Sequence, residues 1–164
     1  MYGSCHCFYY TMDKTYQQAK AECQKNGMNL TAIETDYEND LIVGSIYQHS
    51  TYYLIFTNLD GGKLISHYGN TLDANQYSYY IGAEEVANGF YKWFATGEDA
   101  LYTNWRASQP ENWNSGGAII YNFANTQNYW GKPMGQFFQW DDVSTSWQWQ
   151  EGYICESNQV PSSK

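Results

Sequence analysis

Hydrophobic and polar positions alternate most regularly in the first fifty residues of the chain. Between residues 13 and 27, apolar side chains recur at the spacing of one helix face: Tyr16, Ala19 and Cys23. Thr15 suits the N-cap of this helix, and Gln18 follows three residues later, at the spacing of a capping box. Gly27 suits the C′ position, where glycine is common. The pattern therefore predicts a helix between Thr15 and Gly27.

A second helix and a β-rich remainder follow. After the β-prone stretch 28–33, Thr35 and Glu38 form another capping-box pair, and Leu41 and Ile42 would face inward. Beyond about residue 48 the chain shows β-prone aromatic runs separated by Gly and Asn turns, including an expected hairpin over 51–68 and a last strand over 150–155. The fold class is α+β, with two N-terminal helices and a loop-rich antiparallel β second half in a single domain, 1–164.

Composition and charge argue against nucleic acid and membranes as binding partners. The formal charge is −9, which disfavours nucleic acid because phosphate binding needs Lys and Arg, and is compatible with binding cations. Aromatic residues make up 19% of the chain and charged residues 15%, which is unlike a disordered chain. No apolar run approaches the ~20 residues of a membrane helix, so no membrane partner is expected. No signal peptide is visible at Met1.

Ten short motifs, taken in order along the chain, carry a resemblance to a known family. They lie at residues 7–10, 15–23, 27–33, 38–40, 80–83, 90–93, 102–105, 109–112, 140–142 and 152–156. In this order they resemble a C-type lectin-like domain, of the secreted invertebrate type. The resemblance implies the C-type lectin-like fold and a carbohydrate-recognition function. Relative to the usual domain, the chain has insertions around 49–78 and 121–138.

The four cysteines divide into two pairs. The resemblance implies a disulfide between Cys23 and Cys155, which would require an oxidising compartment and hence secretion; the alternative is two buried thiols. Cys5 and Cys7 are separated by His6 alone, and a bridge across one residue is cramped. Pairing between chains, giving a disulfide-linked homodimer through Cys5 or Cys7, or mutual pairing therefore ranks above a metal site, because no second pair completes a zinc site.

The resemblance also implies a Ca²⁺ site that holds a sugar. Gln109-Pro110-Glu111 resembles the family's triplet, with the amide before the acid as in its galactose-type members and a cis peptide before the proline. Asp141 and Asp142 resemble the residue pair that completes the site. Ca²⁺ takes six to eight oxygens, two of which sugar hydroxyls can supply. The expected metal ligands are Gln109, Glu111, Asp141 and Asp142. The expected sugar is galactose or N-acetylgalactosamine, on glycoproteins or on cell or microbial surfaces.

Two further residues complete the expected sugar site. Trp113 would stack on the apolar face of the sugar, or it is only a loop anchor. The family has a further acid after the triplet, but residues 112–120 contain none, so Asn112, Asn114 or a water must substitute, or the site is vacant. The expected sugar-binding set is Gln109, Glu111, Trp113, Asn114 and Asp141.

Two alternatives remain open. The first is a lectin that binds a sugar, such as its acetamido group, without Ca²⁺, and the missing acid motivates it. The second is a protein-binding or ice-binding module on the same fold. An enzyme is not expected, because the three histidines have no matching nucleophile or acid. Asp141 and Asp142 do not suit a catalytic pair either, since neighbours on a strand point to opposite faces.

Overall fold

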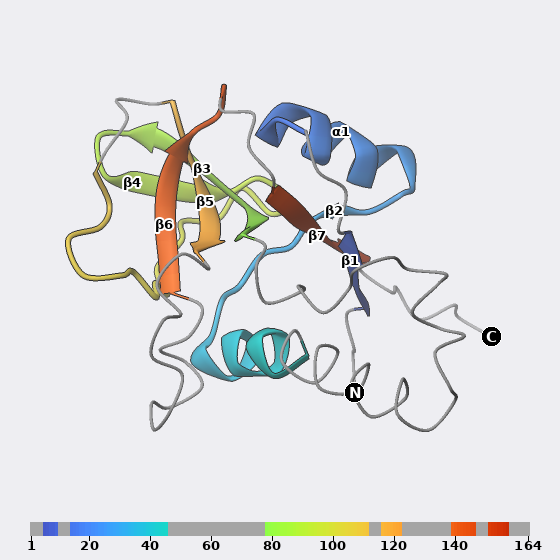
Figure 1. The fold of residues 1–164 in the computed structure, drawn as a ribbon, viewed down its shortest axis with the longest axis horizontal. Coiled ribbons are helices and arrows are strands. Elements are labelled where there is room, and N and C mark those ends of the chain that lie inside the picture. Colours follow the sequence, from blue (N-terminus) through green and yellow to red (C-terminus); the bar gives the residue numbers. More distant parts are fainter. Residues whose placement is uncertain are drawn as a thin grey trace, which may run out of the picture.

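The computed structural model describes residues 5–9, 14–45, 78–111, 116–122, 139–146 and 151–157. Within these ranges the chain forms a seven-stranded sheet and two helices (Figure 1). The labelled elements are β1 Cys5–Tyr9, α1 Tyr16–Lys25, β2 Asn29–Leu30, β3 Ser78–Ala87, β4 Phe90–Trp93, β5 Gly117–Asn122, β6 Gln139–Ser144 and β7 Glu151–Ser157. The second helix, shown in cyan, covers 36–45. The predicted α+β class is therefore confirmed.

The sheet is mixed. Its strands follow the order β1-β7-β3-β5-β6, with β2 paired to β7 and β4 paired to β3. The pairs are antiparallel except β3 with β7, which is parallel. The antiparallel pairing expected of the β-rich second half is present in the pairs of β3 with β4, β3 with β5 and β5 with β6, and the parallel pair of β3 and β7 adds to it. Only short hairpin turns force neighbouring strands to be antiparallel, and β3 and β7 lie far apart in the chain.

Each helix covers one face of the sheet. Figure 1 shows α1 above the sheet and the second helix below it. Because successive side chains on a strand point to opposite faces, the core divides into two clusters. In β3, Tyr80 packs in the cluster under α1 with Tyr16. Its neighbours Tyr79 and Ile81 pack in the other cluster with Ile42 of the second helix.

The first helix forms as its sequence predicts. Thr15 Oγ1 accepts the Gln18 N–H at 3.3 Å, and Gln18 Oε1 accepts the Thr15 N–H at 2.9 Å, which completes the capping box. Gly27 has φ +71° just beyond the helix end, a conformation that favours glycine. Cys23 is bonded to Cys155 of β7, so the predicted disulfide is confirmed and ties α1 to the sheet.

The cap of the second helix differs from a reciprocal box. Thr35 Oγ1 accepts the Glu38 N–H at 3.1 Å, as predicted. The Glu38 carboxylate, however, accepts the N–H of Glu34 at 2.9 Å rather than that of Thr35. The Glu38 side chain is therefore held one residue further back, near the entry to the helix.

The inward face of the second helix is shifted from the predicted one. Ile42 and Val43 are buried, but Leu41 is 54% exposed, so its predicted inward position is wrong. Asn39 is buried instead, and its Oδ1 accepts the Tyr121 hydroxyl at 2.8 Å. The buried face of this helix therefore consists of Asn39, Ile42 and Val43, at positions i, i+3 and i+4. An apolar pattern alone would not include the polar Asn39 in this face.

An aromatic cluster anchors strand β6. Trp140 is fully buried. Four rings meet it nearly edge-on, with centroids 5.6–6.3 Å away: Trp93, Tyr102, Trp105 and Tyr121. Edge-to-face pairs at this distance are favourable beyond the area that they bury. The cluster therefore fixes the position of Asp141 and Asp142, the next two residues of β6.

Two further secondary-structure predictions concern the last strand and a hairpin. The last strand is confirmed at Glu151–Ser157. The hairpin expected over 51–68 lies outside the described residues. Among the residues that the structure describes, no helix is long and apolar enough to cross a membrane.

Candidate ligand-binding site

The loop that carries the proline triplet is attached to β6 through the backbone. Trp105 and Trp140 form an isolated parallel bridge, and Arg106 donates its N–H to the Trp140 carbonyl at 2.9 Å. Gln109 donates its N–H to the Arg106 carbonyl at 3.0 Å, which closes a turn. The peptide between Gln109 and Pro110 is cis, as predicted. The loop therefore presents residues 109–111 at a defined place beside the end of the aromatic cluster.

Three of the predicted site residues meet at one backbone N–H. Glu111 donates this N–H to Asp142 Oδ1 at 2.7 Å and to Gln109 Oε1 at 3.2 Å. Gln109 is half-buried and the Glu111 side chain is exposed. The structure thus places Gln109, Glu111 and Asp142 together, with the Asp142 carboxylate acting as an anchor for the loop.

The second oxygen of Asp142 also has a partner in the chain. Asp142 Oδ2 accepts the Tyr91 hydroxyl at 3.0 Å, and Asp142 is buried. Burial, followed by the nearby Asp142 charge, raises the pKa of Tyr91 well above its ordinary value, so the hydroxyl keeps its proton and donates it. Both oxygens of Asp142 therefore hold the strand and the loop in place.

Asp141 forms an ion pair that the sequence did not predict. Arg106 Nη2 lies 2.7 Å from Asp141 Oδ2, and the Asp141 side chain is only 10% exposed. Arg106 and Tyr91 are the residues that the sequence analysis missed. They lie 35 and 51 positions from the aspartates that they contact, and no local pattern connects residues across such distances.

The expected Ca²⁺ ligands, as they are arranged here, do not fit the ion. Ca²⁺ needs six to eight oxygen ligands. Asp141 already faces a guanidinium group, and both oxygens of Asp142 accept hydrogen bonds from the chain. Of the three acids in the predicted set, Glu111 alone is exposed. A Ca²⁺ ion at this set would also lie near the guanidinium group of Arg106, which has the same sign of charge.

Two predicted sugar contacts are not tested by the geometry. Trp113 and Asn114 lie outside the described residues. The stacking role of Trp113 and the substitution of Asn114 for the missing acid therefore stay predictions.

The sequence and structure comparisons with known proteins span nearly the whole chain. No family model matches the sequence. A perlucin-like protein from Mytilus galloprovincialis is 25% identical over 152 residues, which cover 92% of this chain and 75% of that protein.

Two solved structures resemble the fold. The C-type lectin domain of murine dendritic cell inhibitory receptor 2, in complex with N-glycan, has a TM-score of 0.60 at 15% identity and covers 95% of this chain and 91% of its own. A calcium-independent type II antifreeze protein has a TM-score of 0.59 at 16% identity, covering 98% of this chain and 91% of its own. At these identities the likeness is one of fold.

Proposed function

This chain has the C-type lectin-like fold, and on that premise we propose that it is a carbohydrate-binding lectin and not an enzyme. The observation that carries the proposal is the loop over 109–111, where the Gln109 amide oxygen and Asp142 of β6 both accept the N–H of the exposed Glu111. The proposal is supported by the murine C-type lectin domain of similar fold, whose structure contains an N-glycan, and by the perlucin-like relative. A single domain spanning 1–164 is part of the same proposal.

Galactose or N-acetylgalactosamine is the proposed sugar class. In the Gln109 amide, the oxygen accepts the Glu111 N–H, so the amide N–H groups are the part that would donate to a sugar hydroxyl. The Glu111 carboxylate would accept from a neighbouring hydroxyl. This donor-then-acceptor order is the one that the resemblance associates with galactose-type sugars. Trp113 would add contact with the apolar face of the ring.

Direct binding, without Ca²⁺, is the mode that the geometry supports best. Arg106 supplies a positive charge to Asp141, and the chain itself satisfies Asp142. Neither aspartate then needs a metal ion to balance its burial. Ca²⁺ held by the expected four ligands, Gln109, Glu111, Asp141 and Asp142, remains the alternative mode.

We also propose secretion and glycan partners outside the cell. The Cys23–Cys155 disulfide supports an oxidising compartment. The partners would be glycans on glycoproteins or on cell or microbial surfaces. A homodimer linked through Cys5 or Cys7 fits the place of β1 at an end of the sheet order. Gel mobility with and without reductant tests it, since equal mobility would contradict the dimer.

A protein-binding or ice-binding module is the second candidate. The large apolar side chains of Phe90 and Leu101 are 70% and 89% exposed. Exposed apolar side chains of this size can form part of an interaction surface. The calcium-independent antifreeze protein of similar fold belongs to this class by its name. Thermal hysteresis of the purified chain, measured with and without the substitution Phe90→Ser, would detect the ice-binding form.

A glycan array run once with Ca²⁺ and once with a chelator tests the proposed function. If the sugar binds without Ca²⁺, galactose-type glycans should give a signal under both conditions. Glu111→Gln should reduce the signal, whereas Glu22→Gln, an equal charge change on helix α1, should not. Binding lost on chelation would favour the Ca²⁺ mode. The absence of any glycan signal under both conditions would overturn the lectin proposal.

A further inference from the structure

A thiol lies beside the disulfide that ties α1 to the sheet. Cys7 of β1 stands directly opposite Cys155 of β7, and Cys155 is bonded to Cys23 of α1. Cys7 itself carries a thiol. All three side chains pack in the cluster under α1, and Figure 1 shows β1 beside β7 with α1 above them. Three sulfur atoms from three elements therefore share one face of the sheet.

The strand register sets the distance between Cys7 and Cys155. Residues directly opposite each other in an antiparallel pair have Cα atoms about 4.5–5.5 Å apart. Disulfides accept Cα separations of about 4.4–6.8 Å. The side chains of opposite residues project to the same face, with their Cβ atoms in reach of each other. A bond between Cys7 and Cys155 is therefore compatible with the backbone as it stands, without movement of either strand.

The next pair on the same face shows that opposite side chains meet in this register. Tyr9 lies opposite Tyr153, two positions along each strand from Cys7 and Cys155. The two tyrosine rings stack, with centroids 4.7 Å apart and an angle of 6° between the ring planes. Because side chains on a strand alternate with a period of two, Cys7 and Cys155 face each other on the same side.

Burial restricts which thiols can attack the disulfide. Cys23 and Cys155 are both fully buried, so a thiol in solution does not reach either sulfur. Cys7 is half-buried, and its strand lies at one end of the sheet order. Thiol–disulfide exchange needs a thiolate with access to a disulfide sulfur. Cys7 is thus placed between solvent and the buried bond.

We propose that Cys7, Cys23 and Cys155 form a disulfide-exchange site, in which the Cys7 thiolate attacks the sulfur of Cys155. A bond forms between the sulfurs of Cys7 and Cys155, the bond between Cys155 and Cys23 breaks, and Cys23 leaves as a thiolate. The Cys7 thiol gives its proton to solvent, and the Cys23 thiolate takes one up. One disulfide and one thiol are present before and after the step, so it needs no oxidant or reductant.

The exchange would change which elements the disulfide connects. The Cys23–Cys155 bond ties α1 to the sheet, whereas a Cys7–Cys155 bond ties β1 to β7. In the second form α1 keeps its packing on the sheet and loses its covalent attachment. Both bonds close loops of similar length, so the loss of chain entropy hardly favours one form over the other.

The exchange site is separate from the proposed sugar loop. Strands β1 and β6 lie at opposite ends of the sheet order, and the proline loop is attached to β6. The exchange proposal therefore does not depend on the sugar proposal, and each can fail alone. A dimer bond through Cys7 would use the same sulfur, so the exchange is tested on the monomer.

Trapping of thiols measures the exchange in the native chain. The oxidised monomer is incubated at mildly alkaline pH and then denatured in acid with N-ethylmaleimide, which stops the exchange and labels every thiol. Peptide mapping should find label on Cys23, together with a Cys7–Cys155 link, in a fraction of the chains. In Cys7→Ser the label on Cys23 should fall at least tenfold. Equal labelling of Cys23 in both chains, or no label on Cys23 in the native chain, would overturn the proposal.

Cys23→Ser tests the geometry independently of the exchange rate. With its usual partner removed, Cys155 should form a disulfide with Cys7 when the chain is oxidised, and peptide mapping should find that link. Cys5, two positions before Cys7, lies opposite Ser157, so Cys5→Ser is the matched control. Adding Cys5→Ser to Cys23→Ser should leave the link in place. If the folded variant has Cys155 as a thiol or linked to Cys5, the proposed pairing is wrong.

Discussion

Arg106 and Asp141 form an ion pair, with 2.7 Å between Nη2 and Oδ2, that connects the proline loop to strand β6. The pair gives a nearly buried carboxylate a positive charge from the protein itself. The resemblance to the family implies that Asp141 is a metal ligand. In the fold, its partner is an arginine that comes three residues before the triplet.

Removal of Arg106 should destabilise the chain. Arg106→Gln leaves the Asp141 carboxylate without its cation in a site that is 10% exposed. We expect a loss of about 2 kcal/mol in the free energy of unfolding, less than the ~3–5 kcal/mol of a fully buried pair, because Arg106 is 30% exposed. Urea unfolding measures it. Lys92→Gln, which breaks the exposed pair with Asp99, is the matched control and should have a much smaller effect, because solvent screens this pair.

The same variant should change the response to Ca²⁺. With Arg106 replaced by Gln, Asp141 loses the positive charge that it pairs with, so Ca²⁺ should raise the melting temperature of Arg106→Gln more than that of the native chain. Adding Asp141→Asn should remove the gain. A native chain that Ca²⁺ already stabilises as much as the variant would contradict the idea that Arg106 competes with the metal.

The Tyr91 hydroxyl should contribute to stability through Asp142. In the native chain the Tyr91 hydroxyl donates to Asp142 Oδ2 at 3.0 Å. Tyr91→Phe removes this buried donor and leaves Asp142 Oδ2 without the hydrogen bond. The expected cost is about 1–3 kcal/mol in the free energy of unfolding. Tyr37→Phe, at a side chain that is 71% exposed, is the control and should have little effect. Equal effects in urea unfolding would show that the hydrogen bond contributes nothing specific.

Reduction of the disulfide should be costly. Cys23 and Cys155 are 132 positions apart, and in the chain-entropy model a loop of this size is worth about 4–5 kcal/mol. Unfolding with and without reductant measures the loss. Cys7→Ser should show the same loss on reduction, because it leaves the Cys23–Cys155 bond in place. No change on reduction would contradict a structural role for this bond.

Local features of the fold could be predicted from the sequence, and contacts between distant segments could not. The capping box of Thr15 and Gln18 spans three positions, so the residues that make it are visible together. The prediction for Leu41 failed because the apolar pattern does not reveal that Asn39 has a buried partner on another strand. Burial of a polar residue depends on tertiary contacts that local periodicity does not record.

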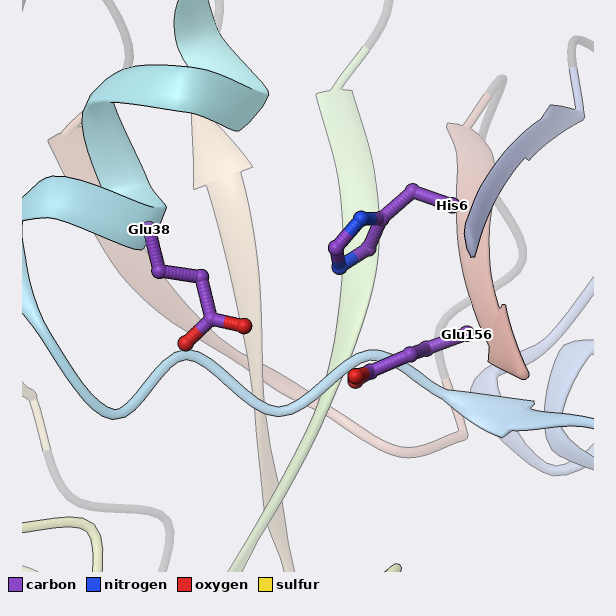
Figure 2. A group of neighbouring side chains, drawn as sticks. All are labelled: His6, Glu38 and Glu156. Carbon is purple, nitrogen blue, oxygen red and sulfur yellow. The ribbon is translucent and has the colours of Figure 1, made fainter. Parts of the chain in front are cut away.

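The candidate site shows the same division. The structure places Gln109 and Asp142 at the N–H of Glu111, while the ligand roles that the resemblance implies for them stay predictions. Two further contacts of the site come from Arg106, which no motif includes, and from Tyr91, to which its motif at 90–93 gave no role in the site. His6 of β1, Glu38 of the second helix and Glu156 of β7 also lie close together (Figure 2). Their proximity depends on strand register and on the packing of a helix, and both are visible only in the fold.

Calorimetric titration of the chain with a galactose-type or N-acetylgalactosamine glycan in the presence of EDTA tests metal-free sugar recognition at the proline loop. We expect measurable binding in EDTA, little changed by added Ca²⁺, and at least tenfold weaker binding by Glu111→Gln than by Glu22→Gln. Binding that needs Ca²⁺, or binding that Glu111→Gln leaves intact, would contradict metal-free recognition at the proline loop.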